Sequence, residues 1–456
     1  MDLGLAIKER ALTIGFDLAG IAPLGVWRDL EFSRQWVEKG FNGEMSYLEN
    51  PKRFDPRLVL PSAKSVICLG LVYNAPFPCS TEVSEGTGKN QESGVRSQKK
   101  EDRARNPLVR PGPPVAGDDG QRTTGNGQPT PGAWISRYAW GHDYHQIMRA
   151  RLEQLRAVVE ELAPGVETRV FVDTGPVVER AFARFSGIGW MGKNTCIINQ
   201  EKGSWFFLGV ILTSLELAPD LPAPDRCGSC TACLEACPTG ALVEPYVMDA
   251  SRCISYLTIE LHCSIPDEFR PKIGHNVFGC DICQDVCPWN NSRQSAVLSS
   301  QQVASQERHS SDRHHATHPA TTKVSQFHPM TVAAIHPAPE DGGVRKQLTT
   351  EDGPLTMDDG PLTTDHRPLA TDPASYSLYN PPLDALASIS PEGFRRIFAH
   401  SPIKRAKYSG WLRNLCVAMG NSGDERFVPW LKQAAKRSDP VVREHAAWAL
   451  KRLRGK

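Results

Sequence analysis

Eight of the thirteen cysteines in this 456-residue chain have the spacing of ligands to two iron–sulfur clusters. One run is Cys227-x2-Cys230-x2-Cys233-x3-Cys237-Pro238, the other is Cys280-x2-Cys283-x3-Cys287-Pro288, and Cys253 lies between them. In bacterial two-cluster proteins three closely spaced thiolates bind one cubane, and the fourth cysteine, before proline, binds the other. The pattern therefore predicts one 4Fe–4S cluster on Cys227, Cys230, Cys233 and Cys287, and a second on Cys237, Cys253, Cys280 and Cys283.

Three other interpretations of these cysteines are a zinc site, a disulfide framework and clusters with a purely structural role. Zinc sites usually consist of two C-x2-C pairs separated by a spacer, which is not the pattern here. Disulfide frameworks are typical of small secreted domains, whereas this chain is long. Clusters with a purely structural role stay open as an alternative. The other five cysteines are interpreted as reduced thiols.

Overall composition excludes few functions. The formal net charge of +1 gives no indication of nucleic-acid binding when averaged over the chain. The first residues are charged and amphipathic and do not resemble a signal peptide. There is no run of about eighteen apolar residues, so we expect no membrane partner. Oxygen-sensitive clusters and free thiols are compatible with a reducing cytoplasm, where we expect the protein to act.

Apolar periodicity predicts alternating helices and strands in the first half of the chain. We expect a catalytic body made of residues 1–75 and 132–220, and an α+β fold. The cluster segment occupies 221–291. Predicted helices cover 3–15, 30–39, 143–162 and 177–185, and predicted strands cover 19–22, 65–73, 168–173 and 205–212.

Two stretches of low complexity interrupt this pattern. Residues 76–131 are rich in Gly, Pro, Ser, Gln, Lys and Arg, which predicts a disordered insertion. Residues 292–380 contain imperfect copies of a Gly-Pro-Leu-Thr motif with too few apolar residues for a stacked core. We interpret this second stretch as a flexible linker.

The last segment, 381–456, is predicted to be helical and basic. From Arg395 to Lys456 there are fifteen Lys and Arg against four Asp and Glu. Amphipathic segments at 410–419, 425–435 and 440–453 are typical of HEAT-type helical pairs with a basic face for a polyanion. The alternative is a set of solvated basic helices without a partner.

Asp173 is the first candidate for acid–base chemistry. It ends a predicted strand and precedes Thr174-Gly175-Pro176, and ligand sites often lie at such strand ends. A buried carboxylic acid there can have a raised pKa and can donate a proton to a departing oxygen. An Asx turn or a helix cap explains the same position equally well. Asp143, flanked by His142 and His145, is interpreted as an N-terminal helix residue and not as part of a metal site.

These motifs together resemble the epoxyqueuosine reductases, cobalamin-dependent enzymes of the last step of queuosine synthesis on tRNA. The resemblance covers about 1–75, 132–291 and 380–456. It rests on the eight cysteines and on Ile135-Ser-Arg-Tyr-Ala-Trp-Gly-His-Asp-Tyr-His145, Val172-Asp-Thr-Gly-Pro176, Gly187-Ile-Gly-Trp-Met-Gly-Lys-Asn194 and Phe278-Gly-Cys-Asp-Ile-Cys-Gln-Asp-Val-Cys-Pro-Trp289.

The resemblance implies a nitroreductase-like cobalamin-binding core, a ferredoxin-like insert with two clusters, and C-terminal HEAT-type helices that help to bind tRNA. It implies that Asp173 is the proton donor. It also implies a set of cobalamin contacts: Arg57, Ser136, Asp173, Asn194, Ser255, Cys280 and Asp281. By charge and motif, the candidate tRNA contacts are Lys404, Arg405, Lys407 and Arg413.

The implied reaction reduces epoxyqueuosine to queuosine, with release of water. Single electrons from an external donor would pass through the clusters to cobalamin, and Asp173 would protonate the departing oxygen. We expect a monomer. Two alternatives remain: another cobalamin and iron–sulfur reductase of the reductive dehalogenase type, or a non-catalytic iron–sulfur electron carrier with an RNA-binding tail.

Overall fold

A four-stranded antiparallel sheet forms the centre of the N-terminal half of the protein. The computed structural model describes residues 2–25, 27–80, 131–290, 320–333 and 375–455. The strand order is β1-β2-β7-β4. The strands are β1 (Leu18–Pro23), β2 (Ser65–Val72), β7 (Phe206–Thr213) and β4 (Thr168–Phe171).

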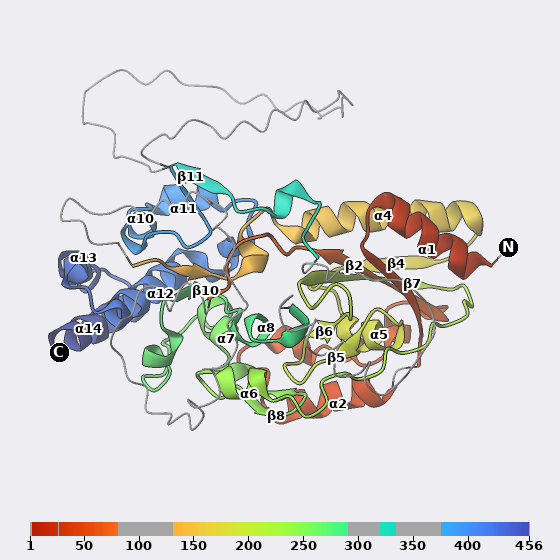
Figure 1. Cartoon of the computed structure of the whole chain (residues 1–456), viewed down its shortest axis with the longest axis horizontal. Helices are drawn as coiled ribbons and strands as arrows, with labels where there is room; N and C mark the ends of the chain where they lie inside the picture. Colours follow the sequence, from red (N-terminus) through yellow and green to blue (C-terminus); the bar gives the residue numbers. More distant parts are fainter. Residues whose placement is uncertain (1, 26, 81–130, 291–319, 334–374, 456) are drawn as a thin grey trace, which may run out of the picture.

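Helices cover both faces of this sheet (Figure 1). Because side chains alternate along a strand, Ile67 and Leu69 of β2 pack on one face, while Val66 and Cys68 pack on the other. The first face is covered by α1 (Leu3–Ile14) and α4 (Tyr144–Leu162). The second face is covered by α5 (Glu179–Phe185) and by Leu30 of α2 (Trp27–Glu38). Every residue of β2 is buried as a result.

Short elements make up the cluster segment. Its helices are α6 (Ala232–Ala236), α7 (Ile254–Ile259) and α8 (Ile282–Asp285), and its strands are β8 (Leu242–Glu244), β9 (Val247–Met248) and β10 (Asn276–Phe278). Strand β10 pairs in parallel with β3 (Trp134–Ile135), which joins the segment to the core. A hairpin of β5 (Trp190–Met191) and β6 (Ile197–Ile198) lies between α5 and β7 in sequence.

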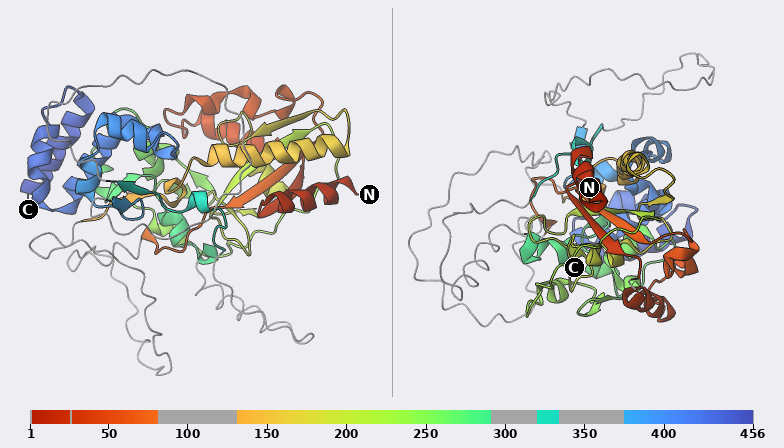
Figure 2. Two further views of the ribbon diagram at one scale, coloured as in Figure 1. Left: turned by 90° about the horizontal axis from the view of Figure 1, so that it is seen from above. Right: turned by 90° about the vertical axis from the view of Figure 1, so that its right-hand side faces the viewer.

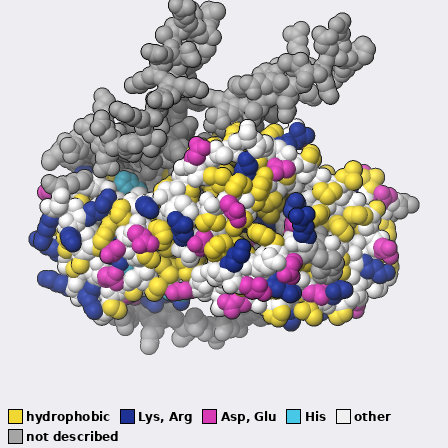
Figure 3. All heavy atoms as spheres, turned by 90° about the horizontal axis from the view of Figure 1, so that it is seen from below, with side chains coloured by type: hydrophobic (Ala, Val, Ile, Leu, Met, Phe, Trp, Pro, Cys, Tyr) yellow, Lys and Arg dark blue, Asp and Glu magenta, His cyan; other side chains and the backbone are white. Residues whose placement is uncertain are grey.

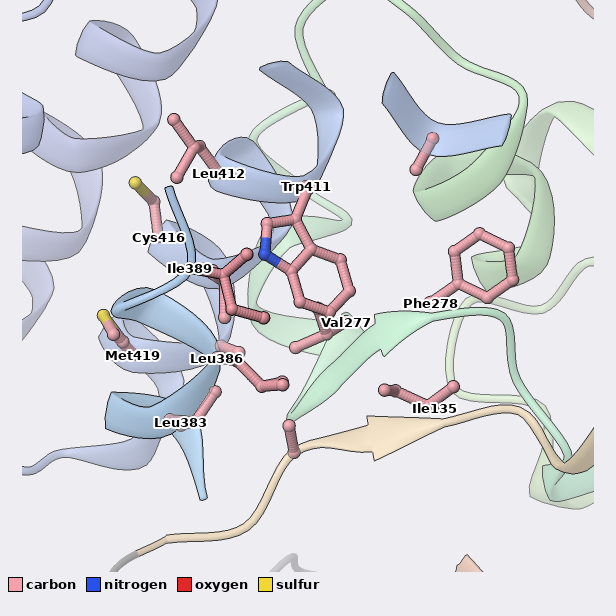
Figure 4. Close-up of a cluster of buried hydrophobic side chains, with 14 of the residues drawn as sticks. Ile135, Val277, Phe278, Leu383, Leu386, Ile389, Trp411, Leu412, Cys416 and Met419 are labelled. Carbon is pink, nitrogen blue, oxygen red and sulfur yellow. The ribbon is translucent and has the colours of Figure 1, made fainter. Parts of the chain in front are cut away.

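The C-terminal helices form the end of the molecule opposite the N-terminus (Figure 2). They are α10 (Leu383–Ala387), α11 (Pro391–Ile397), α12 (Lys407–Ser422), α13 (Val428–Ala434) and α14 (Pro440–Arg454), with the 3-10 turn η9 (Pro402–Ala406) before α12. Trp411 packs with Leu386 and Ile389 against Val277 of β10 and Ile135 of β3 (Figure 4). The helices therefore share a hydrophobic core with the cluster segment.

The linker prediction is wrong for residues 320–333. Phe327 is 3% exposed and packs edge-on against Phe207 of β7, with ring centroids 5.1 Å apart. The backbone N–H of His142 donates to the carbonyl of Gln326 at 2.7 Å. Strand β11 (Thr331–Ala333) pairs with β12 (Ser375–Ser377). A few apolar residues are enough to hold this polar segment against the core, because burying each large side chain stabilises the contact. The insertion predicted at 76–131 lies mostly outside the described residues.

The α+β class is confirmed, and the predicted helices and strands of the core are found at their expected places. Within the described ranges, none of the helices combines the length and the apolar character that a bilayer span requires.

Candidate active site

Asp173 lies in the loop that connects β4 to α5. Its φ of +49° is in the left-handed region, where residues other than glycine are uncommon and are often functional. Half of its side-chain surface is exposed. Helix α5 has Val178 as its N-cap residue, without a side-chain cap. Asp173 is therefore not the cap of this helix, and its carboxylate is turned to other partners.

Three side chains meet the same carboxylate oxygen of Asp173. The Tyr144 hydroxyl donates to Oδ2 at 2.7 Å, His145 Nε2 lies 3.5 Å from it, and Arg405 Nη1 lies 3.7 Å from it. Burial alone would raise the pKa of Asp173, but His145, Tyr144 and Arg405 outweigh it and lower the pKa to about 2. The sequence allowed a raised pKa for this carboxyl, whereas in this state of the protein its pKa is lowered and Asp173 is ionised at neutral pH.

His145 connects Asp173 to a second carboxylate. Its Nδ1 lies 2.7 Å from Oδ1 of Asp143, and Asp143 Oδ2 accepts from Lys404 Nζ at 2.8 Å. Asp143 is also the N-cap of α4, as the sequence predicts. Burial disfavours the imidazolium, yet the two carboxylates outweigh this and raise the pKa of His145 to about 9. The pair at neutral pH is thus an imidazolium beside a carboxylate.

Arg405 brings the C-terminal part of the chain into this site. It ion-pairs with Glu260 (Nε to Oε1, 2.8 Å) and donates to the Tyr47 hydroxyl at 3.2 Å. Burial lowers its pKa, but Glu260, Tyr47 and Asp173 together raise it. Arg405 thereby joins residues that lie more than 140 positions before it in the sequence into one charged cluster around Asp173.

A cavity of about 1050 Å³ opens beside Asp173. It lies between α2, α5 and β5 on one side and the cluster segment on the other, and Phe32, Trp36 and Trp190 contribute to an apolar lining. Glu179 also lines it; this residue is 8% exposed, and its Oε1 has no hydrogen-bond partner in the described structure. Burial first, and then the charge of Asp173, raises the pKa of Glu179 to about 8. The cavity is large, and its lining combines an apolar surface with several charged side chains, among them Arg53, Asp173 and Glu179.

The eight motif cysteines fall into two groups of neighbours. Burial, followed by repulsion from Cys227 and Cys230, raises the pKa of Cys233 to about 11, and Cys287 interacts with Cys227 and Cys233. In the other group, Cys280 and Cys283 each interact with Cys253 and Cys237. No three described His, Cys, Asp and Glu side chains converge on one metal ion. Buried thiols with raised pKa values need nearby cations to ionise, which cluster irons supply.

Comparison with known proteins agrees with this arrangement. A family described as "4Fe-4S double cluster binding domain" matches residues 226–290, and one described as "Epoxyqueuosine reductase QueG, DUF1730" matches residues 117–174. An epoxyqueuosine reductase of Pseudomonas aeruginosa is 32% identical over 457 residues, which are 99% of this chain and 94% of that protein. The chain belongs to the epoxyqueuosine reductase family.

Solved structures of this family share the fold. One, an epoxyqueuosine reductase with a tRNA-Tyr epoxyqueuosine-modified stem loop, is 27% identical, with a TM-score of 0.66 over 99% of this chain and 90% of that one. Another, from Bacillus subtilis, has an aspartate-bearing catalytic loop swung out of the active site; it is 26% identical, with a TM-score of 0.66 over 99% of this chain and 90% of that chain.

Among the cofactor contacts implied for the epoxyqueuosine reductases, Asp173 lines the cavity. Ser136 is buried and donates to Asp281 Oδ1 at 2.6 Å. Asn194 is 3% exposed and donates to the carbonyl of Cys283 at 3.1 Å. These contacts support the cysteine loops. The cavity lining does not include the other six predicted residues: Arg57, Ser136, Asn194, Ser255, Cys280 and Asp281.

The predicted tRNA contacts divide into two kinds. Arg413 is 1% exposed, and its guanidinium donates to the carbonyls of Leu257, Leu261 and Cys263 at 2.6–2.8 Å. The assignment of Arg413 to tRNA is therefore wrong, because the side chain is enclosed and instead anchors α12 to the end of α7. Lys404 is 49% exposed, and Lys407 is exposed as well; these two and Arg405 stay predictions.

Sequence reasoning missed His145, Tyr144 and Glu179 as members of the site. Tyr144 and His145 belong to the Ile135–His145 motif. Their positions, one and two residues after the predicted helix start at Asp143, were the available signal. For Glu179, the only signal is an acidic residue at the start of a short apolar helix.

Proposed function

We propose that this chain reduces epoxyqueuosine to queuosine in tRNA, the last step of queuosine synthesis. The observation that carries the proposal is Asp173, which lies at the edge of a large cavity bounded by the cluster segment. Membership of the epoxyqueuosine reductase family, whose Pseudomonas aeruginosa member is matched over almost its full length, supports the same reaction.

Two 4Fe–4S clusters occupy the two thiol groups in this proposal. Cys227, Cys230, Cys233 and Cys287 bind one, and Cys237, Cys253, Cys280 and Cys283 bind the other. The support is the neighbourhood of the thiols within each group and the match to a double-cluster domain. An external single-electron donor reduces them.

The cavity beside Asp173 fits cobalamin. Its volume of about 1050 Å³ suits a large cofactor, and the unpartnered, buried Oε1 of Glu179 is available to the amide groups at a corrin periphery. Phe32, Trp36 and Trp190 would pack on the apolar surface of the macrocycle. Bound there, cobalamin would supply the low-potential redox chemistry that protein side chains lack. The other six predicted contacts do not line this cavity and stay predictions from the family resemblance alone: Arg57, Ser136, Asn194, Ser255, Cys280 and Asp281.

Asp173 is the proton donor in this reaction. Asp173 lines the cavity. Its left-handed backbone conformation ends the extended conformation of the preceding strand. The solved Bacillus subtilis relative has an aspartate-bearing catalytic loop swung out of the active site, which is consistent with a carboxylate carried by a loop.

The substrate tRNA binds beside the C-terminal helices, which we interpret as HEAT-type pairs. Figure 3 shows dark blue Lys and Arg side chains along the left-hand edge, the end of the molecule at which α13 and α14 lie. Lys404, Arg405 and Lys407 precede or begin α12 and would contact phosphates near the active site. The nitroreductase-like description of the core, the monomeric state and the cytoplasmic location belong to the same proposal.

The test is anaerobic reconstitution with iron, sulfide and cobalamin, followed by an assay on tRNA carrying epoxyqueuosine with nucleosides measured by mass spectrometry. We expect queuosine. Asp173→Asn should retain both clusters and cobalamin but lose about 10²-fold or more in rate, whereas Asp384→Asn, at an exposed position, should not. Bound cobalamin without conversion would point to another reductase, and clusters without cobalamin to an electron carrier.

A further inference from the structure

Reduction of an epoxide to an alkene consumes two electrons and two protons. Both C–O bonds break, a C=C bond forms, and the oxygen leaves as water with two hydrogens that the epoxide oxygen did not carry. Asp173 delivers one proton at a time and, with a pKa of about 2, carries none at neutral pH before the reaction. A neighbouring group that is protonated at neutral pH can supply protons to it.

We infer that His145 is this group: it passes each proton from its Nε2 to Oδ2 of Asp173, from which the proton reaches the departing oxygen. The inference rests on the proposed function and deepens it. In each step the N–H bond of the imidazolium breaks and an O–H bond to Asp173 forms. The carboxyl then protonates the substrate oxygen, and solvent restores the imidazolium. The electrons come from the external donor of the proposed reaction.

The geometry directs one ring nitrogen of His145 to Asp173. Nε2 is buried without a hydrogen-bond partner in the described structure, and it lies 3.5 Å from Oδ2 of Asp173. Nδ1 is held by Asp143 at 2.7 Å, and the ring stacks on Tyr144 with centroids 4.2 Å apart. The orientation of the imidazole is thus set on two sides, as in carboxylate–histidine pairs that perform proton transfer.

His145 acts through Asp173 and is therefore a positioning residue that also holds protons. Asp173 lines the cavity, whereas His145 is not among the lining residues. Solvent reaches the histidine, because 28% of its side chain is exposed, and Lys404, which binds Asp143, is 49% exposed. Lys404, Asp143 and His145 thus connect an exposed amine to Oδ2 of Asp173.

The charges around His145 and Asp173 favour a protonated His145 beside an ionised Asp173. Asp143 and Asp173 raise the pKa of His145 to about 9, so the imidazolium persists at neutral pH. The charged and titratable groups that face the pair from neighbouring elements are Tyr144 of α4, Lys404 and Arg405 of η9, Glu260 after α7, Glu179 of α5, Tyr138 and Tyr47.

The test uses reconstituted, reduced enzyme in single turnover on epoxyqueuosine tRNA. We expect His145→Ala to lose about 10²-fold in rate and to regain part of it, saturably, with added imidazole. His142→Gln, at an exposed histidine three residues earlier, should equal the unsubstituted enzyme. A His145→Ala rate within twofold of the control, or no response to imidazole, would overturn the inference.

Two pH measurements separate proton supply from a merely structural role. The unsubstituted enzyme should lose rate as the pH rises through about 9, and Asp143→Asn should move this loss to lower pH. Independently of activity, the NMR titration of His145 should have its midpoint near that value and shift down in Asp173→Asn. A midpoint at the ordinary histidine value near 6.5 would contradict the inference.

An inactive unsubstituted enzyme would refute the proposed function as well, whereas an active enzyme whose rate does not change when His145 is substituted would refute the inference alone.

Discussion

The guanidinium of Arg405 lies 3.7 Å from the carboxylate of Asp173, although the two residues come from opposite parts of the chain. Arg405 belongs to η9, directly before the long helix α12, and Asp173 to the loop after β4. The segment proposed to bind tRNA phosphates therefore contacts the proposed proton donor itself. A phosphate that drew Arg405 away would raise the pKa of Asp173, because an opposite charge near a carboxylate favours its ionised form.

Arg405→Gln tests this relationship. We expect the pKa of Asp173 to rise from about 2 towards its ordinary value, measured by carboxyl carbon NMR in a pH titration. The matched control is Lys404→Gln, because Lys404 binds Asp143 instead; it should shift the titration of Asp143 more than that of Asp173. An unchanged Asp173 titration in Arg405→Gln would contradict the electrostatic coupling.

Substitutions of Arg413 and Lys407, both in α12, test whether each residue contributes to stability or to tRNA binding. Arg413→Met removes charge-assisted hydrogen bonds to three carbonyls and should lower the free energy of unfolding by about 3 kcal/mol. Lys407→Gln, at an exposed position, should leave unfolding unchanged and should reduce tRNA affinity and its salt dependence. Denaturant unfolding and binding at several salt concentrations check both. An Arg413 variant of normal stability with weakened tRNA binding would restore its assignment to tRNA.

The cluster assignment predicts which thiols matter. Cys287→Ser and Cys283→Ser should each lose about half of the iron, because each removes a ligand of a different cluster. Cys196 interacts electrostatically with both of these thiols but belongs to neither set of four. Cys196→Ala should therefore keep all of the iron, as measured by iron analysis and electron paramagnetic resonance. Iron loss in Cys196→Ala equal to that in the other two would show that the ligand sets are wrongly assigned.

Phe327 tests whether residues 320–333 stabilise the core. Removing a side chain that is 3% exposed and packed on Phe207 leaves a cavity, so Phe327→Ala should cost about 3 kcal/mol of unfolding free energy. The exposed neighbour His328 provides the control, and His328→Ala should have little effect. Equal stability of the two variants would return this segment to the linker interpretation.

Local sequence predicted the cluster ligands and located most of the secondary structure. Cluster thiolates come from short loops, so their spacing is visible along the chain, and the match of residues 226–290 to a double-cluster domain agrees with that spacing. Apolar periodicity likewise located the helices and strands of the core, because burial of one face imposes the period.

Only the tertiary structure decided which charges are available. Arg413 and Lys407 are both basic residues of the same predicted helical region, yet Arg413 is buried and donates to carbonyls about 150 residues earlier in the chain. The pKa of Asp173 depends on Arg405 and His145, whose approach results from packing of the C-terminal helices and of α4. Residues 320–333 are polar on average, and a few large side chains dock them. Burial and charge pairing are properties of distant neighbours, and local spacing does not record them.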